Sequence, residues 1–458
     1  MDGVIRPKVL KGFRDSLPDR EIPRRKLIRA LEDHFISYGF VPIDTPALEY
    51  AEILLSKGGG ETDKQTYRFT DRGGRDVSLR FDLTIPFARY VALHQHDIAM
   101  PFKRYHIAKV WRGENTQRGR YREFVQCDFD IVGTNAITAD LEIMLMMAGG
   151  LKKIGAGKNQ IRFSHRGVFN NLLNRLGLEN QSIQVLRIVD KMSKLGAKEI
   201  RSQLTGLVGG KNADLLLDFI TVEKDNPSTL TKMTQLAQGF DGRRGSPSGP
   251  REKPPATEQL GIILDAVDEL TMQENLVLDP SITRGLDYYT GIVFETYLEN
   301  LPSLGSVCSG GRYDNLTGLF TRNTVSGVGA SIGLDRLMTG LEELDSLNLT
   351  ASNTDILILS LDEGLLVHYQ RYARDMRENG LSAEVYPEPK KIGAQFKYAE
   401  SRDIPLALIV GPEEKAAGIV NLKDLRTRDN YNGISFEKAR VKARDLISKK
   451  HNTAIRPY

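Results

Sequence analysis

Residue types that often build special sites are scarce in this sequence. Its 458 residues include two cysteines, one tryptophan and seven histidines. Cys127 and Cys308 are too few for a disulfide framework or a four-thiolate zinc site, so we expect a reducing compartment and two buried free thiols. His94 and His96 lie in the stretch HQHD without further Cys or His partners, and no metal ligands are predicted.

Long apolar runs and an excess of one charge are also missing. No stretch approaches the roughly 18 apolar residues of a membrane span, and the first residues lack the apolar centre of a secretory signal. Lys and Arg total 63 against 59 Asp and Glu, a net charge of +4, so a polyanionic partner would have to meet local basic surface. We therefore expect a globular, cytoplasmic protein of two or three domains.

The order of apolar and polar residues predicts an α+β fold. Residues 21–38 have helical spacing, and four later stretches alternate with period two: KQTYRFT, DVSLRFDLT, FKRYHIAKVWR and EFVQCDFDIVG. The first two are joined by the hairpin turn DRGG, so we expect an antiparallel sheet. A helix is expected at 140–152, followed by a mainly helical insertion at about 166–275. Its stretch GFDGRRGSPSGPREKPPA is interpreted as a solvated loop or as a basic finger for a polyanion.

The C-terminal part has a different pattern. Its short apolar runs are separated by helical segments, which is typical of strands buried on both faces in an α/β domain: DILILS, SAEVY and PLALIVG. We therefore expect one domain over 1–350 and a smaller α/β domain over 351–458. Residues 421–458 contain ten Lys or Arg against four Asp or Glu, which indicates either a solvated helix face or a surface for a polyanion.

Polar side chains gather on one face of the predicted strands. In EFVQCDFDIVG, Gln126, Asp128 and Asp130 alternate with apolar residues, and Asp82 occupies a similar position in SLRFDLT. A water-facing surface would explain each pattern separately. The neighbouring stretch, however, adds several arginines: Arg112, Arg118, Arg120 and Arg122. Together these groups suit a ligand with both a cation and an anion, such as an amino acid combined with a nucleoside triphosphate.

A glycine-rich stretch, SGVGASIGLDRL, can be interpreted in two ways. Gly327, Gly329 and Gly333 only nearly match the dinucleotide-binding fingerprint. The small residues could instead allow a ligand to approach the backbone, with Arg336 in the first turns of a helix whose dipole favours phosphate. The sequence contains no Walker A motif, so binding of a triphosphate would have to depend on arginine side chains.

Several of these stretches resemble the motifs of class II aminoacyl-tRNA synthetases. GFVPIDTPALE is similar to motif 1, VWRGENTQRGRYREFVQCDFDIVG to motif 2, and GVGASIGLDRL to motif 3. Within that class, RGLDYYTG and CSGGRYDNL resemble the two signatures of histidyl-tRNA synthetases. The similarity begins at KGFRD, continues into the C-terminal domain, and is weakest over 166–275.

The resemblance implies roles for individual residues. The expected catalytic residues are Arg284, which would contact the histidine carboxylate and the α-phosphate of ATP, and Arg112, which would also contact that phosphate. Asp82 and Asp130 stand where many bacterial members have glutamate, which makes each arm shorter by about one methylene. The implied histidine-binding residues are Asp82, Thr84, Gln126, Asp130, Arg284, Tyr288 and Tyr289. The implied ATP-binding residues are Arg112, Glu114, Arg120, Phe124 and Arg336.

The resemblance also implies a reaction and its partners. Histidine and ATP, with Mg²⁺, would give histidyl-adenylate and pyrophosphate without a general base, and the 3′-end of tRNA(His) would then accept the histidine. Motif 1 implies a homodimer, and the C-terminal domain would bind the anticodon. The insertion would hold the acceptor arm of the tRNA rather than edit products, because a site that hydrogen-bonds a polar side chain can reject isosteres without editing.

Two alternatives remain open. The histidyl-tRNA synthetase-like regulatory subunit of ATP phosphoribosyltransferase is a non-catalytic histidine sensor with the same fold, although such proteins typically lack the C-terminal domain and the arginine-bearing signature. A class II synthetase for proline, threonine or glycine is the second alternative, but Tyr288 and Tyr289 favour an imidazole ligand. A dinucleotide-dependent oxidoreductase agrees even less well with the sequence, because the glycines only nearly match the dinucleotide-binding fingerprint.

Overall fold

The structure is a computed structural model that describes residues 5–55, 65–237, 254–283, 289–315, 317–322, 324–347 and 349–454. Its internal contacts divide the chain into two compact units, one formed mainly by residues 28–346 and the other mainly by residues from 347 onward. Within the described ranges, no helix is both long and apolar enough to cross a bilayer.

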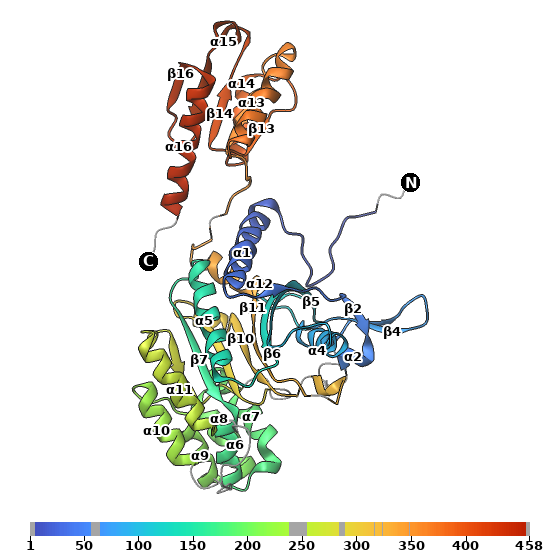
Figure 1. The fold of residues 1–458 in the computed structure, drawn as a ribbon, viewed down its shortest axis with the longest axis vertical. Helices are drawn as coiled ribbons and strands as arrows, with labels where there is room; N and C mark the ends of the chain where they lie inside the picture. The colour runs from blue at the N-terminus through green and yellow to red at the C-terminus, as the bar shows by residue number, and fades with distance from the viewer. Residues whose placement is uncertain are drawn as a thin grey trace. The chain divides into compact units, whose positions relative to one another are not determined.

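The first unit is built around one large sheet (Figure 1). Eight of its described strands follow the order β1-β5-β6-β11-β10-β9-β7-β8. Pairing is antiparallel except between β1 and β5 and between β7 and β8, which confirms the predicted antiparallel sheet. The strands are β1 (Val41–Pro42), β5 (Phe102–Trp111), β6 (Glu123–Val132), β7 (Asn159–His165), β8 (Leu276–Leu278), β9 (Ile292–Leu298), β10 (Cys308–Tyr313) and β11 (Gly327–Gly333).

A smaller sheet of the same unit contains β2 (Leu48–Tyr50), β4 (Asp76–Leu79) and β3 (Arg68–Thr70), in that order. The DRGG hairpin turn joins β3 to β4, and the Asp71 carboxylate accepts hydrogen bonds from the backbone N–H groups of Gly73 and Arg75. The predicted strand through Thr84 is too long, because β4 ends at Leu79 and helix α4 begins at Thr84. Asp82 Oδ1 accepts a hydrogen bond from Ile85 N at 3.2 Å in the first turn of that helix.

One face of the large sheet is apolar and packed. Cys127 and Phe129 of β6 are fully buried, and Phe35 of helix α1 lies 5.0 Å from Phe129 between ring centroids. Helix α5 covers the same strands with a row of buried methionines and aliphatic side chains, among them Ile143 and Met147. The described α-helices of this unit outside the insertion are α1 (Pro18–Ser37), α2 (Ala51–Leu55), α4 (Thr84–Leu93), α5 (Ile137–Lys153) and α12 (Leu334–Glu343).

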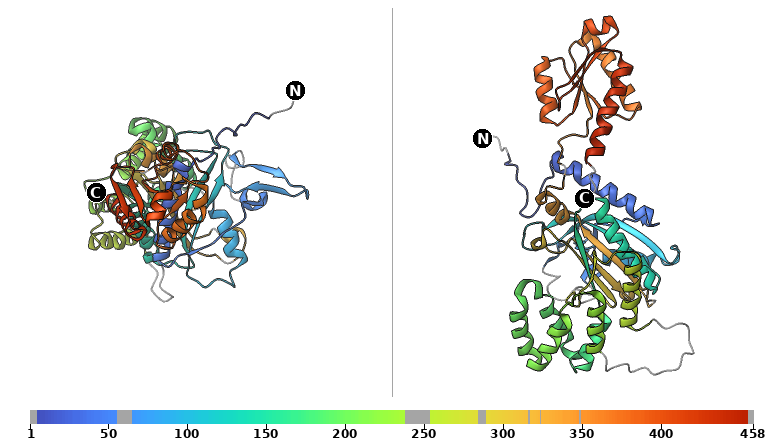
Figure 2. Two further views of the ribbon diagram at one scale, coloured as in Figure 1. Left: turned by 90° about the horizontal axis from the view of Figure 1, so that it is seen from above. Right: turned by 90° about the vertical axis from the view of Figure 1, so that its left-hand side faces the viewer.

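The insertion is helical, as its pattern predicts, and its helices pack together beside the sheet (Figures 1 and 2). Gly196 interrupts α8 with φ +77°, a left-handed backbone conformation that favours glycine. Phe169 and Phe219 pack edge to face between two of these helices, with ring centroids 5.3 Å apart. The helices are α6 (Arg166–Arg175), α7 (Ser182–Val189), α8 (Met192–Val208), α9 (Gly210–Ile220), α10 (Asn226–Ala237) and α11 (Ala256–Glu269).

The second unit contains a five-stranded sheet in the order β13-β12-β14-β15-β16. The three predicted apolar strands are confirmed as the parallel strands β13 (Ala383–Val385), β12 (Ile356–Ile358) and β14 (Leu406–Ile409). Two further strands, β15 (Val420–Asp424) and β16 (Asn430–Ile434), extend the sheet in antiparallel fashion. β15 alternates apolar and polar residues and β16 is polar and largely exposed, so the criterion of a continuous apolar run missed both. The helices are α13 (Leu366–Glu378), α14 (Ile392–Ser401), α15 (Pro412–Ala417) and α16 (Phe436–Ala454).

Candidate active site

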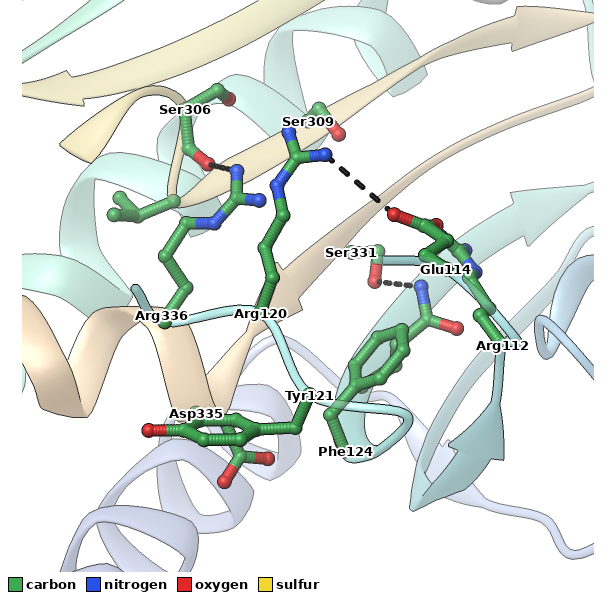
Figure 3. Close-up of a pocket in the computed structure, with 14 residues that line it drawn as sticks. Arg112, Glu114, Arg120, Tyr121, Phe124, Ser306, Ser309, Ser331, Asp335 and Arg336 are labelled. Atoms are coloured by element: carbon green, nitrogen blue, oxygen red, sulfur yellow. Dashed lines mark hydrogen bonds and ion pairs between the residues drawn. The ribbon is translucent and has the colours of Figure 1, made fainter. Parts of the chain in front are cut away.

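A cavity of about 280 Å³ opens over the polar face of β6 and β11. Its walls come from the loop after β5, from β6, from the segment before β10, and from the start of α12 (Figure 3). Ser309 and Ser331 line it from two neighbouring strands. Six residues that the sequence places in one site line this cavity together: Arg112, Glu114, Arg120, Phe124, Gln126 and Arg336.

Arginine side chains give the cavity its positive charge. Arg112 Nε donates to the carbonyl of Phe81 at 2.9 Å, which fixes the side chain at the pocket wall. Arg336 Nη1 donates to the Ser306 carbonyl at 2.8 Å. Figure 3 shows the guanidinium groups of Arg120 and Arg336 extending toward the same end of the pocket. Fixed cations arranged in this way suit phosphate oxygens, because a guanidinium group can donate two parallel hydrogen bonds.

Glu114 lies between Arg112 and Arg120 and forms only long ion pairs with them. Its carboxylate oxygens lie 3.7 Å from Arg112 Nη1 and 3.6 Å from Arg120 Nη1. The Phe124 ring stands nearby, with the Arg112 guanidinium carbon 5.2 Å from its centroid. The flat ring therefore offers a stacking surface beside the cations.

Two of the four arginines that the sequence groups into one site do not line the cavity. Arg118 pairs with Glu343, and its side chain is about half exposed at 51%. Arg122 turns toward the N-terminal segment and Glu114, where its backbone N–H donates to the Gly12 carbonyl at 2.8 Å and its Nε to the Glu114 carbonyl at 3.2 Å. The hairpin loop bends at the bridge between Gln117 and Arg120, so alternate arginines leave the site.

Asp335 supports the cavity but was not predicted from the sequence. Its Oδ2 accepts a hydrogen bond from Val125 N at 2.7 Å, and its Oδ1 pairs with Arg14. The Arg14 guanidinium carbon also lies 3.8 Å from the centroid of the Tyr121 ring. The carboxylate thus ties the start of α12 to β6, and its position directly before Arg336 in LDRL was the available signal.

A buried charged cluster lies further along the same face of β6. Arg104 of β5 is fully buried, and its Nη2 lies 2.6 Å from Asp130 Oδ2. The Tyr313 hydroxyl donates to Asp130 Oδ1 at 2.6 Å. The Phe87 ring of α4 covers the guanidinium group, with 4.0 Å between the guanidinium carbon and the ring centroid. Sequence reasoning missed Arg104 and Tyr313, although both occupy polar-face positions in the period-two pattern.

Burial dominates the acidity of the carboxylates in this cluster. It raises the pKa of Asp82 and of Asp130, and Arg104 lowers both pKa values in opposition. Burial raises the pKa of Asp128 to about 7; Arg104 opposes this shift, and the neighbouring Asp130 adds to it. These carboxylates therefore hold protons more readily than exposed ones do.

Glycines leave room for two side chains on this face. A Cβ at Gly329 would overlap the Asp130 carboxylate, and a Cβ at Gly311 would lie 3.1 Å from Cδ1 of Tyr289. The Tyr289 ring packs against an apolar cluster that includes Tyr313 and Phe87. Asp130 and Tyr289 therefore both lie over the glycine-bearing strands β10 and β11, as a common subsite requires.

The remaining predicted histidine-binding residues include three that the structure describes and two that it does not. Thr84 is the first residue of α4, and Asp82 precedes it within electrostatic reach of Arg112 and Arg104. Gln126 joins the two groups, since it lines the cavity and shares a strand face with Asp130. Arg284 and Tyr288 lie outside the described residues.

The insertion holds both ends of the segment that carries these two residues. Arg166 begins helix α6; its Nη1 donates to the Thr283 carbonyl at 3.1 Å, and its backbone N–H donates to the Gly291 carbonyl at 2.8 Å. Thr283 Oγ1 in turn donates to the Leu186 carbonyl of α7 at 3.3 Å. This arrangement could not be predicted from the sequence, because it depends on contacts between distant segments.

The prediction of two buried thiols is confirmed, since Cys127 and Cys308 are both buried and form no disulfide. Burial raises the pKa of the Cys308 thiol, which therefore stays protonated. His106 is a residue of β5, and its Nε2 lies at hydrogen-bonding distance, 3.0 Å, from Asp44 Oδ1. Across the part of the chain that the structure describes, no three His, Cys, Asp or Glu side chains gather as a metal-binding group.

Comparison with known proteins gives consistent results. The sequence model of histidyl-tRNA synthetase matches residues 12–337, and that of an anticodon binding domain matches residues 355–446. A histidine–tRNA ligase of Treponema denticola is 50% identical over 416 residues, 90% of each chain. One of Rhodopirellula baltica is 44% identical over 430 residues, 93% of this chain and 95% of the relative.

Solved structures agree on the fold. The crystal structure of histidyl-tRNA synthetase from a Nostoc species superposes with a TM-score of 0.86 at 28% identity, covering 97% of this chain and all of that one. An ATP phosphoribosyltransferase regulatory subunit/histidyl-tRNA synthetase from Bacillus halodurans has a TM-score of 0.73 at 22% identity, which shows a shared fold alone.

An antiparallel sheet with an arginine-lined cavity on one face, followed by an α/β anticodon-binding domain, defines a class II aminoacyl-tRNA synthetase. Within that class, the chain belongs to the histidyl-tRNA synthetase family.

Proposed function

We propose that this protein is a histidine–tRNA ligase, which activates histidine with ATP and transfers it to the 3′-end of tRNA(His). The observation that carries the proposal is the single polar sheet face on which Gln126 connects an arginine-lined cavity to a buried carboxylate cluster. One end suits phosphates and the other suits a cationic amino acid with a polar ring. The two reactants of adenylation would thus meet across Gln126.

The carboxylate end is the proposed histidine subsite. Asp82, Thr84 and Gln126 would hold the α-ammonium group. Asp130 and Tyr289 would orient the imidazole, with Tyr288 beside them. The ion pair with Arg104 at 2.6 Å and the Tyr313 hydroxyl fix the Asp130 carboxylate before the substrate arrives. Such preorganisation lowers the cost of ordering the site on binding.

The arginine end is the proposed nucleotide subsite. Arg112 and Arg284 would act as the catalytic residues, because negative charge develops on the α-phosphate as the histidine carboxylate attacks it in line. Arg120 and Arg336 would hold the outer phosphates, and Phe124 with Arg336 would enclose the adenine. Arginines stay charged at every relevant pH, so they stabilise this charge without transferring a proton.

Mg²⁺ would accompany the ATP. Magnesium in nucleotide sites takes most of its ligands from phosphates and water, with one or two protein carboxylates. Glu114 fits this need, since its nearest arginine nitrogens are 3.6 and 3.7 Å away, whereas Asp335 already accepts the Val125 N–H. The ion would supply further neutralisation of phosphate charge.

We propose that residues 1–350 form the catalytic domain, with the insertion at about 166–275 holding the tRNA acceptor arm, and that residues 351–458 bind the anticodon. A homodimer is supported by apolar side chains on the small sheet, where Tyr50 is 47% exposed and Phe69 48%. Buried free cysteines support a cytoplasmic location. Sedimentation equilibrium would test the dimer; a monomer at micromolar concentration would contradict it.

Loop residues Arg243, Arg244 and Arg251 lie outside the described residues, and the sequence makes them a candidate contact to the tRNA. Replacing all three by neutral residues should weaken tRNA binding and reduce the slope of log affinity against log salt by roughly one to three. An unchanged affinity and slope would rule out this contact.

Amino-acid-dependent ATP–pyrophosphate exchange tests the main proposal. With each of the twenty amino acids supplied in turn, we expect exchange with histidine alone. Exchange with another amino acid would overturn the proposed substrate. Histidine binding without exchange would favour the regulatory subunit of ATP phosphoribosyltransferase as the functional relative.

A further inference from the structure

Asp128 is the carboxylate of the polar face to which family resemblance assigns no role. It lies on β6 between Gln126 and Asp130 and is 2% exposed. Its register neighbours are His106 on β5 and Ser331 on β11. Since side chains two apart on a strand share a face, Asp128 faces the region between the proposed ammonium-binding and imidazole-binding residues.

The groups around Asp128 carry charges of both signs. Arg104 attracts it, but that guanidinium group is already paired with Asp130 at 2.6 Å. Asp130 and Asp82 repel it, and the Ser331 hydroxyl stabilises its ionised form. Burial lowers the pKa of His106 to about 4, so this imidazole is neutral and adds no cation. The remaining facing groups from packed elements are Gln126 on β6, Cys308 on β10 and Arg80, a buried cation that also attracts Asp128.

Several buried polar atoms on this face have no hydrogen-bond partner among the described residues. They are the guanidinium nitrogens of Arg104 and two acceptors near Ser331, Oδ1 of Asp128 and Oε1 of Gln126. Gln126 Nε2 donates to Ser331 Oγ at 3.0 Å, which holds the amide in place beside the carboxylate. An acceptor that is buried without a donor is unfavourable, so such a pair indicates a missing donor.

We propose that Asp128 is a third carboxylate of the histidine subsite and that it accepts a hydrogen bond from the substrate α-ammonium group together with Gln126. This inference rests on the proposed function. An ammonium group carries three N–H donors and one positive charge, so it satisfies both free acceptors and adds a cation beside the carboxylates of Asp128 and Asp130. A water molecule would supply donors but no charge, and an imidazole N–H would supply one donor.

The acidity of Asp128 agrees with this role. Its pKa is raised to about 7 in the absence of substrate, chiefly by burial. The carboxyl group therefore holds a proton for part of the time near neutral pH, and a bound cation would replace that proton.

The test is to compare three ligands on the wild type and on the Asp128→Asn variant by titration calorimetry. Histidine carries the ammonium, carboxylate and imidazole groups, histidinol lacks the carboxylate, and imidazole-4-propionate lacks the ammonium. Because asparagine keeps the shape and removes the charge, we expect histidine and histidinol to bind about ten- to a hundredfold more weakly. Binding of imidazole-4-propionate should change by less than about twofold.

Each other outcome overturns the proposal. Equal weakening of all three ligands would place Asp128 against the imidazole, and unchanged binding would show that it has only a structural role. Ser331→Ala provides an independent variant should Asp128→Asn fail to fold, and it should weaken histidine and histidinol several-fold but not imidazole-4-propionate. Asp97→Asn is the matched control, since it removes the same charge from a side chain that is 78% exposed.

The test also separates this inference from the proposed function. Wild-type protein that neither binds histidine nor supports histidine-dependent exchange would refute both. Wild-type protein that does so, beside an Asp128→Asn variant with unchanged ligand binding, would refute the role of Asp128 alone.

Discussion

The two faces of β6 are buried to a similar degree, but the side chains on them make different kinds of contact. On one face, Cys127 and Phe129 have no exposed surface, and the contacts with α1 and α5 complete their packing. On the other face, Asp128 and Asp130 are 2% and 4% exposed and lie among other buried charged groups, including Arg104 and Arg80. Burial alone therefore does not distinguish the packed core from the candidate site. On β6 the two faces differ in their buried acceptors without a hydrogen-bond partner, which belong to Gln126 and Asp128.

The difference reflects a division between stability and function. The apolar face gains free energy from burial and packing in the unliganded protein. Burying carboxylates on the polar face costs free energy, and in our proposal a bound cation would offset part of this cost. Variants on the two faces should therefore separate stability from ligand binding.

The largest effect is expected from Phe129→Ala on the apolar face. Removing a fully buried ring should lower the free energy of unfolding by about 3–5 kcal/mol, measured by urea denaturation. Ile131→Val, at the same face, should cost about 0.5–1.5 kcal/mol. Histidine affinity of the folded protein should not change. A loss below about 1 kcal/mol for Phe129→Ala would contradict the packed-core account.

Arg112→Ala should act on catalysis rather than stability. Loss of one charge-assisted contact to the transition state should reduce ATP–pyrophosphate exchange by about ten- to a hundredfold. Arg118→Ala is the control, because this arginine belongs to the same loop region but pairs with Glu343 outside the cavity. Similar losses in both variants would show that the positive charge of the loop region matters, and not the position of Arg112.

The pH dependence of histidine affinity should differ between the wild type and Asp128→Asn. The pKa of Asp128 is raised to about 7 in the unliganded protein, and a bound ammonium group favours the ionised form. Affinity should therefore rise by roughly five- to tenfold from pH 6 to pH 7.5 relative to the variant. The variant also corrects for titration of the substrate imidazole. Parallel profiles would contradict the assignment.

The smallest effect is expected from Arg166→Lys, where the insertion meets the sheet. Lysine keeps the charge but cannot reproduce the guanidinium contact with the Thr283 carbonyl, whereas the backbone contact to Gly291 remains. The KM for histidine should rise about two- to fivefold while the KM for ATP stays constant. Equal changes in both constants would indicate a general loss of structure.

Much of this architecture could be predicted from the sequence. Period-two patterns predicted β5 and β6, and the stretch around Arg336 predicted the start of α12, because these elements have one face buried in a core. The strand predicted through Thr84 was too long, since the alternation continues past Leu79 while Asp82 and the following residues already form a helix start. The exposed strand β16 gave no apolar signal.

The site was predicted in part for a similar reason. Arg112, Arg120 and Arg336 could be grouped from their motifs, and they line one cavity. Arg104 and Tyr313 could not be assigned, because their relation to Asp130 depends on strand pairing and on side-chain direction across three strands. Arg118 and Arg122 were misplaced, since a single bend in the loop turns alternate side chains away.

Thermal unfolding of the wild type and Asp128→Asn at pH 8, with and without histidine, tests the contrast between the two faces most directly. Because the pKa of Asp128 is raised in the folded state, the free energy of unfolding of the wild type falls as pH rises toward about 7. The unliganded variant lacks this carboxylate and should melt at the same temperature as the wild type or higher. Histidine at about ten times the wild-type Kd should raise the melting temperature of the wild type and barely change that of the variant. A variant that melts lower than the wild type and is stabilised equally by histidine would contradict the account.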